Sequence, residues 1–269
     1  MGTCQVGTDD GYYSQGYTQI KKINKENNIK KAMMSGRADE LLTMVQDKDP
    51  AEGLQLLVRE YPGKIVFTTS FGVEDQVITD MIFTNKLPVE VITLDTGRLF
   101  RETYRVFSKT IEKYGRNIKT YFPDTSSVEK LLSEKGPYSF YDSVENRKEC
   151  CHIRKVEPLN RALKGMKCWV TGIRASQSAG RDELQMIKID KSRHIYKYNP
   201  LLNWELSDVE QYIKEHNVPY NILHDRGYVS IGCEPCTRAV KAGEDFRAGR
   251  WWWESGSAKE CGLHENDQG

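Results

Sequence analysis

No stretch of the 269-residue chain is apolar enough to cross a membrane as a helix, which takes about 20 consecutive apolar residues. The N-terminal segment 1–6 has no apolar core of a signal peptide, and Val6 breaks the myristoylation pattern by standing where Ser or Thr is required. Because the formal net charge is only +1, no strong overall field favours nucleic acid or a membrane surface. We therefore predict neither of these partners, and any anion has to be bound by a local arrangement of charges.

The chain also has no internal repeat, no low-complexity tract and no linker that would separate two domains. Residues 1–36 are polar and show no sustained periodicity, which predicts a loosely ordered N-terminal extension. Residues 37–269 are numerous enough to bury a core. We predict that they form one domain, which includes a C-terminal segment from about 240 to 269.

Short runs of β-branched and aromatic residues alternate with helical patterns along this domain. The predicted strands are 65–68, 89–94, 118–122 and 168–170, with a hairpin formed by 184–189 and 195–198. The predicted helices lie within 38–61 (broken near Pro50), from Val73, after Arg98, from capping boxes at Ser126 and Ser207, and from Glu149 to Leu163. This alternation predicts an α/β fold, with a mostly parallel sheet covered by helices on both faces.

Two loops, 69–72 and 95–98, follow predicted strands, and ligands of such sheets bind beyond the carboxyl ends of the strands. Loop 69–72 precedes a helix, whose first N–H groups can bind phosphate or sulfate oxygens. It matches neither the Walker A loop nor the G-x-G-x-x-G turn, and a plain tight turn is an equally good interpretation. Glu74 and Asp75 suit the positive end of the helix dipole but would compete with a bound anion.

Four of the seven cysteines fall in two short segments, where Cys150 and Cys151 are adjacent and Cys233 and Cys236 form a C-x-x-C pair. Four thiolates suit zinc or an iron–sulfur cluster, and their spacing does not decide between the two; a redox dithiol is a further interpretation of the C-x-x-C pair. Cys261 is a separate thiol in a Gly-flanked segment near the C-terminus. Because no export signal is present, this cysteine content indicates a reducing cytoplasm.

Arginines precede a run of three tryptophans, 251–253, near the C-terminus. The forked N–H groups of Arg247 and Arg250 suit phosphate or sulfate oxygens. The polar loop 173–181 carries Arg174 and Arg181, which form either an anion clamp or a solvated surface.

Together these motifs resemble the assimilatory adenosine 5′-phosphosulfate reductases, which are thioredoxin-dependent sulfonucleotide reductases, from about Lys64 to His264. The resemblance is carried by Thr69-Ser70-Phe71-Gly72-Val73-Glu74-Asp75, Leu94-Asp95-Thr96-Gly97-Arg98, Cys150-Cys151 with Arg154-Lys155, Cys233-x-x-Cys236, Arg247-x-x-Arg250-Trp251-Trp252-Trp253 and Glu260-Cys261-Gly262-Leu263-His264. The paired cysteines are typical of the cluster-bearing branch. The resemblance implies an adenine nucleotide alpha-hydrolase-like (PP-loop-type) fold with a mobile C-terminal tail.

The resemblance also implies a reaction in sulfate assimilation. The Cys261 thiolate attacks the sulfur of the bound phosphosulfate, AMP leaves, and a thiol of thioredoxin or glutaredoxin reduces the resulting S-sulfocysteine to release sulfite. Lys155 and His264 assist at the sulfate; for His264 an exposed tail histidine is the alternative interpretation. The implied ligands of one 4Fe–4S cluster per chain are Cys150, Cys151, Cys233 and Cys236. The implied nucleotide contacts are Thr69, Ser70, Gly72, Leu94, Gly172, Arg174, Arg247 and Arg250.

Other functions stay open. Phe71, Ala175 and Ser176 depart from the family pattern on the 3′ side of the ribose, so 3′-phosphoadenosine 5′-phosphosulfate, or both substrates, are alternatives. A zinc-stapled nucleotide- or nucleic-acid-binding module, with the tryptophans as stacking platform, is an alternative of another class. An adenylating relative would carry a Gly-Gly-x-Asp-Ser loop, which this chain lacks. The oligomeric state is also open, with a homo-oligomer possible.

Overall fold

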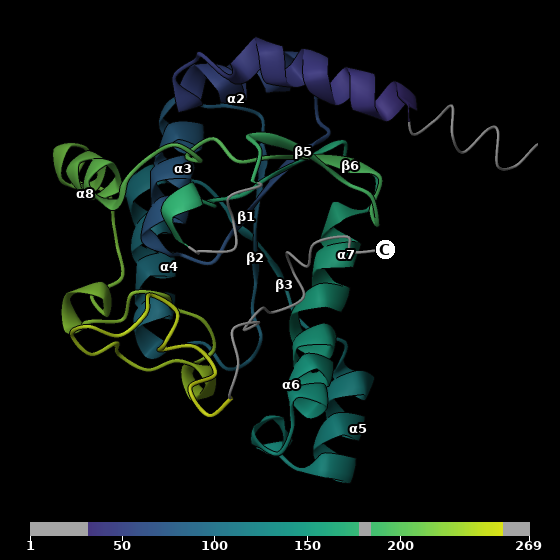
Figure 1. Cartoon of the computed structure of the whole chain (residues 1–269), viewed down its shortest axis with the longest axis vertical. Helices are drawn as coiled ribbons and strands as arrows, with labels where there is room; N and C mark the ends of the chain where they lie inside the picture. The colour runs from purple at the N-terminus through teal and green to yellow at the C-terminus, as the bar shows by residue number, and fades with distance from the viewer. Residues whose placement is uncertain (1–31, 178–183, 255–269) are drawn as a thin grey trace, which may run out of the picture.

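The computed structural model describes residues 32–177 and 184–254. A six-stranded sheet lies at its centre, in the order β3-β2-β1-β4-β6-β5 (Figure 1). All neighbouring strands are parallel except β5, which is antiparallel to β6. The strands are β1 (Ile65–Thr69), β2 (Glu90–Leu94), β3 (Lys119–Tyr121), β4 (Cys168–Val170), β5 (Ile187–Asp190) and β6 (Ile195–Tyr198). The predicted α/β fold and the predicted hairpin are thereby confirmed.

Helices cover both faces of the sheet, with α3 and α4 on one side and α7 on the other (Figure 1). A helix over residues 32–45 comes first. It is followed by α2 (Pro50–Glu60), α3 (Val73–Thr84), α4 (Arg101–Tyr114), α5 (Thr125–Lys135), α6 (Val144–Cys151), α7 (Glu157–Leu163) and α8 (Leu206–Glu215). A π-helical turn, His152–Val156, joins α6 to α7. None of the helices in the described part of the chain is long and apolar enough to span a membrane.

Successive strand residues serve the two faces of the sheet in turn, because side chains alternate along a strand. Ile65 and Phe67 of β1 pack in the larger core with α3. Val66, between them, packs with Trp169 of β4 and Leu159 of α7 in a second core on the opposite face. Both cores are closed to solvent, so the sheet holds the loops at its carboxyl end on a rigid base.

Several boundaries differ from those predicted. Residues 32–36, which were assigned to the extension, are helical, and Met34 among them already packs against the core. The helix predicted from Glu149 starts at Val144. The predicted caps Ser126 and Ser207 are wrong. Asp124 caps α5 by accepting from the Ser127 N–H at 2.9 Å, and Glu205 forms a capping box with Asp208 at the start of α8. In both helices an acidic residue two positions before the predicted cap accepts from the free N–H groups of the first turn.

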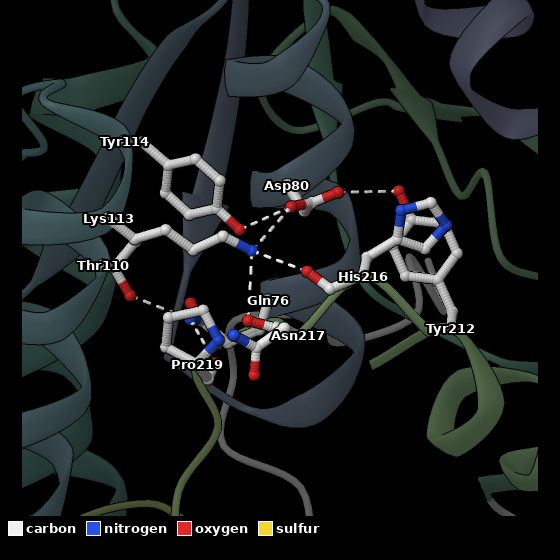
Figure 2. Close-up of polar contacts among 9 residues, drawn as sticks. All are labelled: Gln76, Asp80, Thr110, Lys113, Tyr114, Tyr212, His216, Asn217 and Pro219. Atoms are coloured by element: carbon white, nitrogen blue, oxygen red, sulfur yellow. Dashed lines mark hydrogen bonds and ion pairs between the residues drawn. The ribbon is translucent and has the colours of Figure 1, made fainter. Parts of the chain in front are cut away.

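A buried carboxylate ties α3 to α4 and α8 (Figure 2). Asp80, only 3% exposed, accepts hydrogen bonds from the hydroxyls of Tyr114 at 2.6 Å and Tyr212 at 2.8 Å. Lys113 Nζ lies 3.4 Å from the same carboxylate and donates to the carbonyl of His216 at the end of α8. Burial, followed by the bond to Asp80, raises the pKa of both tyrosines.

We expect Asp80→Ala to lower the free energy of unfolding by about 2–4 kcal/mol, since it leaves two partly buried tyrosine donors without their acceptor and Lys113 without its ion-pair partner. A lower urea midpoint at an unchanged slope would show this loss. Glu112→Ala, at an exposed position on α4, is the matched control and should change the midpoint little. Equal midpoints for the two variants would contradict a stabilising role for Asp80.

Candidate functional site

The carboxyl ends of β1, β2 and β4 meet at one cavity of about 260 Å³, which we call the strand-end cavity. The strand register explains why these ends lie together. Thr69 of β1 pairs with Thr93 of β2, and Phe67 of β1 pairs with Val170 of β4, so the residues after β4 lie level with the end of β1. Most of the predicted substrate contacts line it. These are Thr69, Ser70, Gly72, Leu94, Gly172, Arg247 and Arg250, together with the predicted catalytic residue Lys155.

Arg174 is the one predicted contact in the described chain that does not line this cavity. Its guanidinium is buried, with Nε 2.9 Å from Glu74 Oε1 and Nη1 2.7 Å from the Ser176 hydroxyl. Glu74 lines the cavity and also accepts from Gln177 Nε2 at 2.8 Å. The structure therefore places Arg174 behind the wall, where it neutralises and orients a carboxylate instead of facing the cavity.

Loop 69–72 is closed by the first turn of α3. The Asp75 carboxylate accepts from the Ser70 N–H at 2.6 Å and from the Ser70 hydroxyl at 2.7 Å. Burial raises the pKa of Asp75 to about 6, and the two bonds from Ser70 oppose that rise. The Phe71 N–H donates to the Thr69 hydroxyl at 3.0 Å. These two N–H groups are thus already paired, and an anion at this loop has to use the others.

Two residues explain how the loop and the neighbouring β4 turn fit together. A Cβ at Gly172 would collide with the Asp75 carboxylate, so glycine is required for β4 to approach α3. Phe71 adopts φ +62 and points into the core, where its ring stacks on Phe107 at 4.9 Å. Phe71 therefore packs in the core and does not line the cavity.

The four cysteines of the two motifs line a second, smaller cavity, the cysteine cavity. Cys150 and Cys151 come from the end of α6, and Cys233 and Cys236 from the loop that ends in the 3-10 turn Glu234–Cys236. A π-helical turn directly follows the adjacent pair, and such turns occur often at functional sites. Residues more than 80 positions apart in sequence are thus brought together by the fold.

Loop 95–98 braces the cysteine cavity. The Thr96 hydroxyl lies 3.2 Å from Cys233 Sγ, and the Thr96 carbonyl accepts from Arg154 Nη1 at 2.7 Å. The Glu234 N–H donates to the Arg98 carbonyl at 2.8 Å. The loop therefore supports the cysteines as well as bordering the strand-end cavity, a role that its sequence did not indicate.

The surroundings of the cysteines suit an anionic metal–thiolate group. Arg98 Nη1, Arg154 Nε, Arg250 Nε and Trp251 Nε1 are buried beside this cavity, and none has an acceptor among the described residues. The pKa of Cys236 is raised to about 12, mainly by burial and then by the neighbouring Cys233, whereas Lys155 and Arg250 lower it. Cys233 and Cys236 are buried, Cys150 and Cys151 are partly buried, and several nearby donors need acceptors. A metal–thiolate group would supply those acceptors.

Within residues 32–177 and 184–254, no three His, Cys, Asp or Glu side chains are grouped so as to hold one metal ion. Four cysteine side chains are the donor set that a 4Fe–4S cluster takes, and the buried donors without acceptors around the cysteine cavity suit a group of negative charge.

The two cavities share a wall made of Lys155, Arg250 and Trp251. Arg250 is 7% exposed, and the absence of a Cβ at Gly232 leaves room for its guanidinium in this position. Trp251 is 1% exposed. The centroid of its ring lies 4.7 Å from the guanidinium carbon of Arg250 and also 4.7 Å from that of Arg147. Cationic groups at this wall reach toward both the thiols and the strand-end cavity.

Three predicted residues, Arg181, Cys261 and His264, lie outside the described residues. Conversely, the strand-end cavity includes residues that the sequence did not single out. Gln177, His224, Ser230 and Phe246 are the main ones. His224 and Ser230 belong to a segment that packs beside the cavity through tertiary contacts alone, and no local pattern marks such residues.

Comparison with known proteins agrees with this geometry. Residues 64–239 match the phosphoadenosine phosphosulfate reductase domain family. The adenosine 5′-phosphosulfate reductase of Neisseria meningitidis serogroup B is 50% identical over 200 residues, which cover 74% of this chain and 81% of that protein. The enzyme of the same name from Agrobacterium fabrum is 48% identical over 202 residues, covering 75% and 78%. This chain belongs to the adenosine 5′-phosphosulfate reductase family.

The resemblance seen in the sequence is thereby confirmed, and the fold agrees with it. The crystal structure of the phosphoadenylyl-sulfate reductase from Candida auris, a phosphate complex, superposes with a TM-score of 0.65 at 35% identity. It covers 76% of this chain and 96% of that structure. The strand-end cavity and the cysteine cavity therefore lie in a chain whose fold matches that of a solved phosphoadenylyl-sulfate reductase.

Proposed function

We propose that this chain reduces adenosine 5′-phosphosulfate to sulfite and AMP, with a 4Fe–4S cluster on Cys150, Cys151, Cys233 and Cys236. The observation that carries the proposal is the wall of Lys155, Arg250 and Trp251 shared by the two cavities. It offers cations to a phosphosulfate in the strand-end cavity while facing the cysteines. A nucleotide-binding module would have no need for this shared wall.

The proposed reaction has two steps. The Cys261 thiolate attacks the sulfate sulfur, an S–S bond forms, the S–O bond to the phosphate breaks, and AMP leaves with the bonding electrons. A dithiol protein, thioredoxin or glutaredoxin, then attacks the cysteine sulfur of the S-sulfocysteine. The dithiol becomes a disulfide, and sulfite leaves with two electrons. Because thiols must stay reduced for this step, we place the reaction in the cytoplasm.

Three cationic side chains that line the strand-end cavity stabilise negative charge on the substrate. Arg247 and Arg250 are suited to hold oxygens of the phosphosulfate by forked N–H groups, and Lys155 to offset the charge that AMP acquires as it leaves. The cluster, when bound, supplies electrostatic and structural organisation; two electrons already come from the dithiol, and a single 4Fe–4S centre transfers one at a time. Trp251 excludes water between the two cavities.

Sulfite release by anaerobically purified protein, supplied with thioredoxin, tests the function. Adenosine 5′-phosphosulfate and its 3′-phosphorylated form should be compared at equal concentration. Higher kcat/KM for the unphosphorylated compound supports the proposal, and preference for the other would assign the alternative substrate. Absence of sulfite with both, together with one zinc per chain, would favour the binding module.

Lys155→Ala should slow sulfite release by about 10²-fold while leaving the iron content of the protein nearly unchanged. The reason is that Lys155 borders the cysteine cavity without belonging to the sulfur ligands. Lys164→Ala, an exposed lysine just after α7, is the matched control and should keep full activity. Parallel loss of iron and of activity in Lys155→Ala would instead make this residue structural.

A further inference from the structure

His224 carries a buried hydrogen-bonding atom that the proposed reaction does not use. Its Nε2 has no partner among the residues of 32–177 and 184–254, and the residue lines the strand-end cavity. Buried nitrogens of this kind are normally paired, so an unpaired one in a cavity wall points to a ligand atom. The residue lies in the 3-10 turn His224–Arg226.

The second ring nitrogen defines what Nε2 can do. A hydrogen bond between the imidazole and the Tyr228 backbone raises the pKa of His224, so the imidazole donates and the Tyr228 carbonyl accepts. Since Nε2 is unpaired, the donor is Nδ1–H. Burial, the largest influence, lowers the pKa of His224 and keeps the ring neutral. In that tautomer Nε2 carries a lone pair and can only accept.

The turn that bears His224 is held in place before any ligand arrives. The Asn221 side chain, 1% exposed, donates to the Thr103 hydroxyl at 3.2 Å and accepts from the Leu223 N–H at 3.1 Å. The Tyr228 N–H donates to the Leu223 carbonyl at 3.1 Å, and its ring packs edge-on against Phe100 at 5.6 Å. These contacts hold the backbone around His224, and therefore its Nε2 atom, in a fixed position.

Only a part of the ligand that carries a hydrogen-bond donor can bind to His224 Nε2. A phosphosulfate offers only acceptor oxygens, which cannot pair with the Nε2 lone pair. The nucleoside offers donors: the 6-amino group of adenine and the hydroxyls of ribose. Glu74 lines the same cavity as His224 and is a second acceptor there, whereas Lys155 and Arg250 lie on the wall shared with the cysteines.

We propose that His224 Nε2 accepts a hydrogen bond from the nucleoside of the substrate, and that it is a residue that determines nucleoside specificity. This inference rests on the proposed function, since it takes an adenosine nucleotide as the ligand. The donor is either the adenine amine or a ribose hydroxyl, and the same experiment separates the two sources.

Calorimetric binding of four nucleotides to the holoprotein tests the proposal: AMP, purine riboside 5′-monophosphate (which lacks the amine), 2′-deoxy-AMP and 3′-deoxy-AMP. One of the three analogues lacks the group that donates to His224 Nε2. Wild-type protein should bind this analogue about 10- to 100-fold more weakly than AMP. His224→Phe should weaken AMP and the other two analogues by a similar factor, yet leave binding of that one analogue unchanged. His224→Gln, which retains an acceptor, should recover part of the loss.

Equal weakening of all four ligands by His224→Phe would overturn the proposal, because it would indicate a merely structural role. Unchanged AMP binding in both variants would overturn it as well. If the His224→Phe protein fails to fold, equal binding of all four nucleotides by wild-type protein is sufficient to refute it. Failure of wild-type protein to bind AMP at all would count against the proposed function itself.

Discussion

Cys261→Ser should release no measurable sulfite, a loss of at least about 10³-fold in kcat, while it retains the iron content of the wild-type protein. A serine hydroxyl is almost fully protonated at neutral pH, whereas a cysteine beside cations is partly thiolate. Even if the hydroxyl attacked, the product would be a sulfate ester, which a dithiol cannot reduce. Measurement of sulfite and of iron on the same preparation separates the catalytic effect from loss of the metal centre.

Mass spectrometry adds a direct view of the same step. Wild-type protein incubated with adenosine 5′-phosphosulfate, without any dithiol, should gain one SO₃ group, located on the peptide that contains Cys261. Cys4→Ser, a replacement of the same kind in the N-terminal segment, is the matched control and should gain the group normally. Normal turnover by Cys261→Ser, or an SO₃ group on another cysteine, would refute the assigned nucleophile.

Cys236→Ser should lose most of the iron and the broad absorption near about 400 nm that accompanies a 4Fe–4S cluster. Cys236 is 9% exposed and lines the cysteine cavity, so a serine there removes one of the four proposed sulfur ligands. We expect activity to fall together with iron, because Lys155 and Arg250 border both cavities.

Cys168→Ala is the control for Cys236→Ser. Cys168 is fully buried in β4, where burial raises its pKa to about 12, and it packs in the main core away from the cysteine cavity. It should keep about four irons per chain and lose only some stability. Full iron retention by Cys236→Ser would remove this residue from the ligand set. One zinc per chain in wild-type protein would replace the cluster by the alternative metal.

Much of the fold follows from local patterns. The β-branched run at β1 and the alternation of strands with helices predicted a parallel α/β sheet, and both are observed. The helix starts at Ser126 and Ser207 were wrong because several nearby residues can cap the same N–H groups. Residues 32–36 were not predicted to be helical because Met34 gains its core contacts only in the folded protein.

For the residues of the candidate site, the sequence identified the residue types, but the fold decided which of them lie together. Cys150, Cys151, Cys233 and Cys236 stand out by residue type and spacing, because few side chains bind metals or act as nucleophiles. That they share one cavity is decided by the fold, since the loop after α8 has to return to the end of α6. Arg174 shows the reverse: a loop arginine suits an anion, yet its partner is Glu74, 100 residues earlier.

Residue type and periodicity alone predicted the α/β sheet and most of the helices and singled out the four paired cysteines, because propensity, spacing and chemical identity are local properties. The resemblance of the motifs to known proteins indicated the family. Tertiary packing alone decided that Lys155, Arg250 and Trp251 separate the two cavities, that Asp75 closes loop 69–72, and that His224 Nε2 meets the strand-end cavity unpaired. The physical reason is that burial, hydrogen-bond partners and shared walls depend on which distant segments the sheet brings together.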